Sequence, residues 1–248
     1  CVYIENKLQE ELDVPVFHDD QQGTAIVCGA ALKNSLRLLK RNIEDQKIVV
    51  CGTGAAGNAI IKILDKMGAK NIYATNKKGV ASKNTIDRED QVIKDLINRN
   101  IIKSPDKTIT TLKDILVGAD VFIGVSAKNI VSQEMIESMN KDSIVFAMAN
   151  PEPEILPDLA LAGGAKIVGT GRSDFPNQIN NVLVFPGLMK GVIEARAKSV
   201  TFDIKLAALE AIASLVPEDE LSVENILPDI FDERVAKTVC EAVKKAKK

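Results

Sequence analysis

Short runs of β-branched and apolar residues alternate along the chain with longer stretches whose apolar positions recur at helical spacing. The run Ile48–Cys51 predicts a buried strand, and Ala56–Met67 predicts an amphipathic helix that ends at Gly68, a residue suited to a helix C-cap. A second strand is expected over Asn71–Thr75. A strand, a helix and a strand in this order are typical of a βαβ unit with parallel strands.

Four more apolar runs continue the pattern. We expect buried strands over Asp120–Val125, Ser143–Ala149, Lys166–Gly169 and Val182–Phe185, with a helix over Ser132–Met139. Five or six parallel strands connected by helices indicate an α/β fold. We therefore predict a Rossmann-type doubly wound parallel sheet.

Amphipathic helices flank the predicted sheet on both sides. They are expected over Tyr3–Leu12 and Thr24–Arg41 before the sheet and over Thr201–Leu215 and Pro228–Lys247 after it. We divide the chain into connecting helices (residues 1–45), the sheet domain (residues 46–200) and C-terminal helices that pack on it (residues 201–248).

Composition and charge narrow the function classes. With 46% hydrophobic and 27% charged residues, the 248-residue chain is able to bury a core, and its net charge of −2 gives no electrostatic footprint for nucleic acid or an anionic membrane. No apolar run approaches the roughly 18 to 20 residues of a membrane span, and the first residues do not show the basic-then-apolar pattern typical of a signal sequence. We expect a cytoplasmic protein without nucleic-acid or membrane partners.

The cysteines do not form a recognisable metal or disulfide pattern. Cys1, Cys28, Cys51 and Cys240 lie far apart in the sequence without a C-x-x-C pair. We interpret them as buried thiols rather than as a disulfide or a zinc site.

A glycine-rich loop follows the first strand and opens the first sheet helix. It reads Gly52-Thr53-Gly54-Ala55-Ala56-Gly57 and matches G-x-G-x-x-G. In this setting the glycines allow a tight turn, a close approach of backbone to a pyrophosphate, and close packing of helix on strand. The alternative is a turn that only connects strand and helix; the βαβ context favours dinucleotide binding.

The end of the second strand bears on which dinucleotide binds. NAD-binding units place an Asp or Glu there to accept from the ribose 2′-hydroxyl, and this chain has Asn76, 19 residues after Gly57. Asn76, Lys77 and Lys78 would not repel a 2′-phosphate: Asn76 could donate to it, and the lysines could help to neutralise it. Both lysines also suit a solvated turn. We expect NAD or NADP, with a slight preference for NADP.

Two adjacent carboxylates precede the second N-terminal helix. Asp19 and Asp20 follow His18, the only histidine. Aspartates at this place can cap free NH groups of the helix, or they can bind a hard cation such as Mg²⁺ or Mn²⁺. The residue pattern alone leaves both interpretations open.

The acidic segment belongs to a set of four motifs with a family resemblance. The four segments are Val14–Ala25, Gly52–Gly57, Phe146–Ile155 and Gly171–Gly187. In this order they closely resemble malic enzymes of the bacterial type, and the resemblance runs from Cys1 to the C-terminus. It implies that residues 46–200 form an NAD(P)-binding domain and that residues 1–45 carry a metal-site segment.

The resemblance also implies roles for individual residues. Asp20 would be a ligand of the catalytic Mg²⁺ or Mn²⁺, and Asp19 would support a catalytic lysine. Asn150 would face the nicotinamide riboside and the substrate, and Asn181, with Asn180 beside it, would hold a substrate carboxylate. From the residues alone, these asparagines are ordinary turn signals.

The implied parent reaction is oxidative decarboxylation of L-malate to pyruvate and CO₂, by an enzyme expected to be a homo-oligomer. Malic enzymes have an N-terminal region with a catalytic tyrosine and lysine, a substrate-binding arginine and a Glu-Asp metal pair, and this sequence does not contain it. Its only tyrosines, Tyr3 and Tyr73, do not match that family's tyrosine. We expect a truncated chain, inactive by itself. The alternatives are the cofactor domain of another Rossmann dehydrogenase and a non-catalytic dinucleotide-binding module.

Overall fold

The computed structural model describes residues 2–246, and a six-stranded sheet lies at its centre. The strands are β1 (Lys47–Cys51), β2 (Asn71–Asn76), β3 (Gly79–Ala81), β4 (Val121–Gly124), β5 (Ile144–Ala147) and β6 (Ile167–Thr170). Their order in the sheet is β3-β2-β1-β4-β5-β6, and every pairing is parallel except that of β3 with β2. The chain therefore winds outward in both directions from β1. This is the predicted doubly wound α/β sheet of the Rossmann type.

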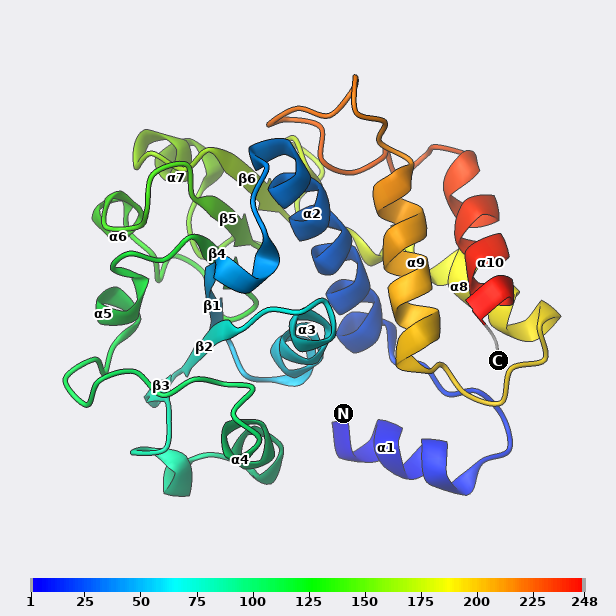
Figure 1. The fold of residues 1–248 in the computed structure, drawn as a ribbon, viewed down its shortest axis with the longest axis horizontal. Coiled ribbons are helices and arrows are strands. Elements are labelled where there is room, and N and C mark those ends of the chain that lie inside the picture. Colours follow the sequence, from blue (N-terminus) through cyan, green and yellow to red (C-terminus); the bar gives the residue numbers. More distant parts are fainter. Residues whose placement is uncertain (1, 247–248) are drawn as a thin grey trace.

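Helices cover both faces of this sheet (Figure 1). Their bounds are α1 (Val2–Glu11), α2 (Thr24–Leu39), α3 (Ala55–Lys66), α4 (Gln91–Asn98), α5 (Leu112–Leu116), α6 (Gln133–Glu137), α7 (Pro157–Ala162), α8 (Phe185–Glu194), α9 (Phe202–Ser214) and α10 (Arg234–Ala246). Helices α5, α6 and α7 lie on one side of the strands, and α2 and α3 lie on the other, with α9 and α10 stacked outside them (Figure 1).

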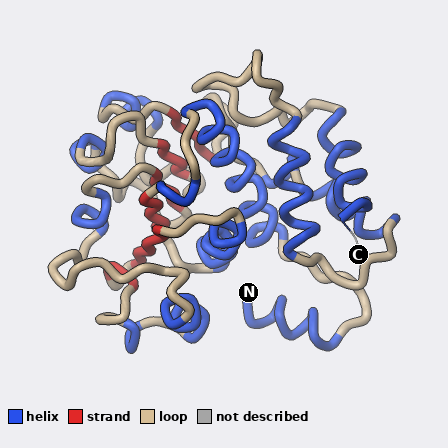
Figure 2. The backbone as a smooth tube through the Cα atoms, in the orientation of Figure 1, coloured by secondary structure: helices blue, strands red, loops and turns tan. Residues whose placement is uncertain are grey.

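The alternation of side chains along the strands builds one apolar core on each face. In β1, Ile48 and Val50 enter the core shared with α2, α3, α9 and α10, whereas Val49 and Cys51 enter the core shared with α5, α6 and α7. Phe122 of β4 is fully buried in the second core. Because both faces are covered, the strands read as continuous apolar runs in the sequence, and they form the stack between helices in Figure 2.

The predicted N- and C-terminal helices contribute to the same core as the sheet. Buried residues of α2, α9 and α10 belong to the cluster that includes Ile48 and Val50. The division of the chain at residues 45 and 200 stays a prediction. No helix within residues 2–246 has both the length and the apolar composition that a membrane span requires.

One predicted strand is wrong. Residues 182–185 lie in a short 3₁₀ turn, Asn181–Leu183, followed by α8. The Asn180 side chain accepts a hydrogen bond from the Val182 backbone N–H at 3.0 Å, which caps the turn, and Pro186 occupies the first turn of α8, where proline is tolerated. The apolar run was a strand signal by composition, but the capping residue in front of it makes a helix start.

Other boundaries and elements also differ from the predictions. The last helix begins at Arg234 rather than at Pro228, because the intervening residues form turns in which Asp229 and Asp232 accept from backbone N–H groups; its predicted last residue, Lys247, lies outside the described residues. Strand β3 and helices α4, α5, α7 and α8 were not predicted. The antiparallel β3 is only three residues long, so its sequence carries little periodicity.

Candidate active site

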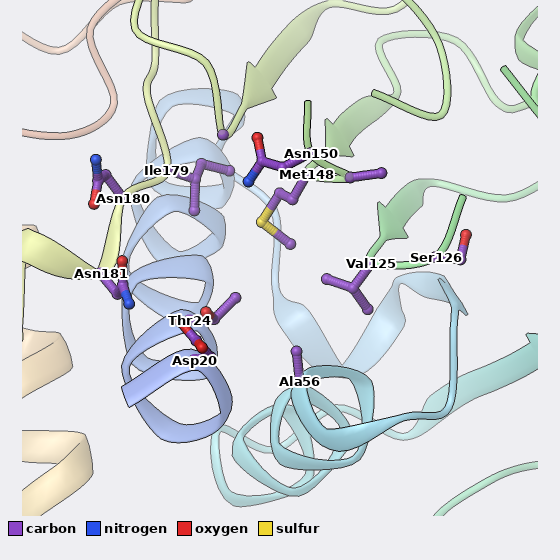
Figure 3. Close-up of a pocket in the computed structure, with 12 residues that line it drawn as sticks. Asp20, Thr24, Ala56, Val125, Ser126, Met148, Asn150, Ile179, Asn180 and Asn181 are labelled. Carbon is purple, nitrogen blue, oxygen red and sulfur yellow. The ribbon is translucent and has the colours of Figure 1, made fainter. Parts of the chain in front are cut away.

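A cavity of about 440 Å³ lies at the carboxyl edge of the sheet. It is lined by Asp20, Thr24, Ala56, Val125, Ser126, Met148, Ala149, Asn150, Gly171, Ile179, Asn180 and Asn181. Figure 3 shows these residues arriving from the start of α2, the start of α3, and the loops after β4, β5 and β6. Ligands of doubly wound sheets bind at this edge, at the point where the strand order reverses.

Several of the sequence-predicted site residues meet in this cavity. Asp20, Ala56, Asn150, Asn180 and Asn181 line it together, although they come from segments up to 161 residues apart. The other predicted site residues, Gly52, Thr53, Gly54, Ala55, Gly57, Asn76 and Asp19, do not line it. They lie in the glycine loop beside it, at the end of β2, and behind Asp20.

The glycine loop has the backbone shape that each glycine role requires. Gly52 has φ +106°, a left-handed conformation that disfavours other residues. A Cβ atom on Gly57 would lie 1.7 Å from the Gly52 carbonyl oxygen, so this glycine lets α3 pack closely on the loop. A Cβ atom on Gly54 would meet nothing within 4 Å. The backbone of Gly54, at the N-terminus of α3, is therefore open to a ligand, and the N–H groups and dipole of a helix start favour an anionic group there.

The acidic pair lies in one π-helical turn, Asp19–Gly23, that runs directly into α2. Asp20 is exposed and points toward the cavity (Figure 3), whereas Asp19 is half-buried and accepts a hydrogen bond from the Asn181 side-chain amide. Burial raises the pKa of Asp19, the charge of Asp20 raises it further, and His18 lowers it. Neither aspartate side chain caps α2, so the capping interpretation is not supported.

Two buried side-chain atoms in this turn, Asp19 Oδ1 and Gln21 Oε1, have no hydrogen-bond partner within residues 2–246. The Asp19 Oδ1 atom is buried and accepts no hydrogen bond from any described residue. A buried carboxylate oxygen without a donor is costly. The arrangement therefore suits a donor or a cation that this part of the chain does not provide.

Buried polar residues hold the π-helical turn against α1 and α9. Glu5 of α1 is 3% exposed and accepts from the Gln21 side-chain amide, from Gln22 Nε2 at 3.1 Å and from the His18 backbone N–H at 3.2 Å. Lys205 of α9 donates to Gln22 Oε1 at 2.8 Å. Burial lowers the pKa of Lys205 to about 8, with the charge of Glu5 acting against the fall and Lys62 adding to it.

A fully buried carboxylate joins two loops that line the cavity. Glu154 Oε1 accepts from the Ser126 backbone N–H at 2.7 Å, and its Oε2 accepts from the Ala149 backbone N–H at 3.1 Å. Gly124 leaves room for this carboxylate, since a Cβ there would lie 2.4 Å from Glu154 Cδ. Glu154 thus fixes the loops after β4 and β5 relative to each other.

Sequence reasoning gave no role to this glutamate or to much of the cavity lining. The lining residues without an assigned role are Thr24, Val125, Ser126, Met148, Ala149, Gly171 and Ile179. Most of them directly follow β4, β5 and β6. Their place at or just beyond the carboxyl end of a predicted strand was the signal that could have identified them. Glu154 lies seven residues beyond the end of β5, where no strand signal applies.

The three described cysteines are free and buried, as predicted; Cys1 lies outside the described residues. Burial raises the pKa of the Cys28 thiol to about 12 and also raises that of Cys51. Cys240 lies close to Glu194 and Glu241, but the Lys244 ammonium pairs with both carboxylates at 3.0 and 3.1 Å. These thiols are therefore structural rather than reactive.

Comparison with known proteins assigns this fold and site to a family. The family model described as "Malic enzyme, NAD binding domain" matches residues 21–247. The bifunctional malic/malolactic enzyme of Bacillus subtilis is 48% identical over 246 residues, which are 99% of this chain and 59% of that protein. The NADP-dependent malic enzyme of Escherichia coli is 40% identical over 263 residues, 99% of this chain and 34% of that protein. The chain thus spans between a third and three fifths of these relatives.

Solved structures agree with the sequence matches. An NAD-dependent malic enzyme from Thermotoga maritima superposes with a TM-score of 0.91 at 45% identity, covering 98% of this chain and 63% of that chain. A malic enzyme from Pyrococcus horikoshii superposes with a TM-score of 0.90 at 40% identity, covering 99% of this chain and 57% of that chain. The family model, the sequence relatives and the solved structures agree. The chain belongs to the malic enzyme family, in which it corresponds to the NAD-binding domain.

Proposed function

We propose that this chain binds NAD or NADP across the glycine loop and the carboxyl-edge cavity, as part of an enzyme that oxidatively decarboxylates L-malate to pyruvate and CO₂. The observation that carries the proposal is the glycine loop itself: Gly57 has no room for a side chain, whereas Gly54 faces open space at the start of α3. This combination leaves the backbone of Gly54 open to a pyrophosphate, which is the role of the second glycine in a dinucleotide-binding loop.

Within this function, the cavity residues bind and orient. Asn150, in the loop that follows β5, is placed to contact the nicotinamide riboside. Asn180 and Asn181 face the cavity from the segment before α8, where their amides suit a substrate carboxylate. Because the Asn181 amide also donates to Asp19, the substrate-binding side and the acidic turn are held together. The Asp19 Oδ1 atom, which has no hydrogen-bond partner among the described residues, fits the support of a lysine supplied by another part of the enzyme.

The donor set also fits a divalent metal. Asp20 is an exposed carboxylate at the cavity wall, a ligand of the type that Mg²⁺ and Mn²⁺ prefer, and its neighbours leave space for water or substrate oxygens. A metal bound there would polarise the substrate oxygen on which negative charge develops. Asp19 is committed to Asn181, so Asp20 is the carboxylate of the pair that we assign to the metal.

Expectations about the wider context stay predictions. They are a cytoplasmic location, a homo-oligomeric enzyme, a small-molecule substrate of the malate and pyruvate type, and no nucleic-acid or membrane partner. The remaining alternative, a non-catalytic dinucleotide-binding module, would bind cofactor without a metal requirement at Asp20.

Calorimetric titration of the purified protein with NAD and with NADP tests dinucleotide binding directly. For the metal, Asp20→Asn keeps the shape of the side chain and removes its charge, so Mn²⁺ affinity should fall at least about tenfold while cofactor affinity stays within about twofold. Asp13→Asn, at an exposed position outside the cavity, is the matched control. Unchanged Mn²⁺ affinity in Asp20→Asn would remove Asp20 from the metal site.

A further inference from the structure

The side chain of Asn76, at the carboxyl end of β2, is held by three hydrogen bonds. Its Nδ2 atom donates to Thr53 Oγ1 at 3.1 Å and to Glu89 Oε2 at 2.8 Å, and its Oδ1 atom accepts from the Lys78 backbone N–H at 2.8 Å. Thr53 belongs to the glycine loop, so the bonds join that loop to β2 and to the turn that precedes α4.

These partners determine which way the amide of Asn76 points. The Lys78 N–H can only donate, and an ionised Glu89 carboxylate can only accept, so nitrogen must face Glu89 and oxygen must face Lys78. Both amide hydrogens are then used within the protein. What Asn76 still offers to a ligand is the second lone pair of Oδ1, which can accept from a hydroxyl but cannot donate to a phosphate.

This geometry corrects the reason for the slight NADP preference expected from the sequence. That reason was that Asn76 could donate to a 2′-phosphate while Lys77 and Lys78 neutralised it. Neither amide hydrogen is free, and the Lys78 ammonium donates to the Arg88 carbonyl oxygen. Lys77, Lys78 and Arg88 are all exposed, so solvent screens their charges.

Glu89 provides a carboxylate at the carboxyl end of β2, where position 76 has none. Its side chain is 7% exposed and lies in contact with Asn76, at the strand end where doubly wound folds hold the adenosine ribose. A carboxylate held out of water is screened less than the exposed lysines nearby. The fixed charge beside the ribose position is therefore negative.

We propose that Glu89 is a specificity-determining residue that makes this site prefer NAD to NADP. Its negative charge disfavours the 2′-phosphate of NADP, and by holding the Asn76 amide it leaves an acceptor toward the 2′-hydroxyl of NAD. The inference rests on the proposed function, because it concerns the cofactor of that same site.

The test is Glu89→Gln, which preserves the size of the side chain and can still accept from Asn76 through its own amide oxygen. Dissociation constants for NAD and NADP are measured by titration on the purified protein at low and moderate salt. We expect the unmutated protein to bind NAD more tightly. We expect the variant to bind NADP about three- to tenfold more tightly than the unmutated protein does, with NAD affinity changed less than about twofold.

Asp87→Asn is the matched control, because Asp87 carries the same charge two residues away at an exposed position. It should leave the ratio of the two constants within about twofold, since an exposed charge is screened. Three results would each overturn the inference. The unmutated protein could bind NADP more tightly than NAD, Glu89→Gln could leave the ratio of the two dissociation constants unchanged, or Asp87→Asn could shift that ratio as much as Glu89→Gln does. If the protein binds NAD but Glu89→Gln leaves the ratio unchanged, only the inference about Glu89 is contradicted. If the unmutated protein binds neither cofactor, the proposed function is contradicted as well.

Discussion

At the scale of single residues, motif chemistry could be predicted where it depends on neighbours in the sequence. The roles of Gly52, Gly54 and Gly57 follow from a six-residue loop, and the structure gives each the conformation or the space that its role needs. The state of Asn76 could not be predicted in this way. Its amide is oriented by Glu89, 13 residues further on in a segment without a motif, and only the fold brings the two together.

The open space over Gly54 leads to a prediction at this scale. Gly54→Val should weaken dinucleotide binding by at least about a hundredfold, because the branched side chain would fill the volume needed by the pyrophosphate. The free protein should tolerate it, since a Cβ there meets nothing within 4 Å. Calorimetric titration measures the first effect and thermal melting the second.

Gly57→Ala is the contrasting variant. Its Cβ would lie 1.7 Å from a carbonyl oxygen, so the substitution should lower the melting temperature. Unchanged NAD affinity in Gly54→Val would make the loop a simple turn.

At the scale of elements, hydrophobic spacing was enough to predict most strands and the long helices, but not how polar side chains fasten one element to another. The π-helical turn Asp19–Gly23 is held between Glu5 of α1 and Lys205 of α9, which is 183 residues away from its partner Gln22. No local signal marks Lys205 as buried, because lysines on amphipathic helices usually face water. The acidic turn is thus positioned by contacts that become visible only in the fold.

The burial of Lys205 has a consequence for stability. Its pKa falls from 10.5 to about 8 in the folded protein, chiefly because burial disfavours the charged form. Between these two pH values the unfolded chain holds a proton that the folded chain has released, so the free energy of unfolding rises with pH across this window. Below pH 8 both states are protonated, and the cost of burying the charge is constant.

Comparison with Lys205→Met isolates this contribution. From pH 8 to pH 10, the unmutated protein should gain about 1 to 3 kcal/mol of unfolding free energy relative to the variant. Urea denaturation at several pH values provides the measurement. Lys198→Met, at an exposed position ahead of the same helix, controls for the loss of a positive charge. If the difference in unfolding free energy between the two proteins does not change over this pH range, burial does not lower the pKa of Lys205.

At the scale of the whole molecule, the doubly wound sheet could be predicted because its strands are buried on both faces and read as apolar runs. The same rule failed at residues 182–185, where an equally apolar run continues into α8 because Asn180 caps the turn in front of it. It also missed β3, which pairs antiparallel at the edge of the sheet over three residues. Composition thus identifies what is buried, and capping and edge position decide the conformation.

The last prediction concerns what the 248-residue chain can do by itself. Proton transfer to and from a substrate requires an acid and a base within hydrogen-bond reach. Among the described residues that line the cavity, Asp20 is the only titratable one, and no lysine, tyrosine or histidine joins it. We therefore expect this chain to bind dinucleotide without reducing it when malate and Mn²⁺ are added. A steady-state assay with each cofactor is the measurement, and cofactor titration of the same preparation shows that the site is folded. Sustained malate-dependent reduction would show that a side chain outside the described lining enters the cavity and acts as the base.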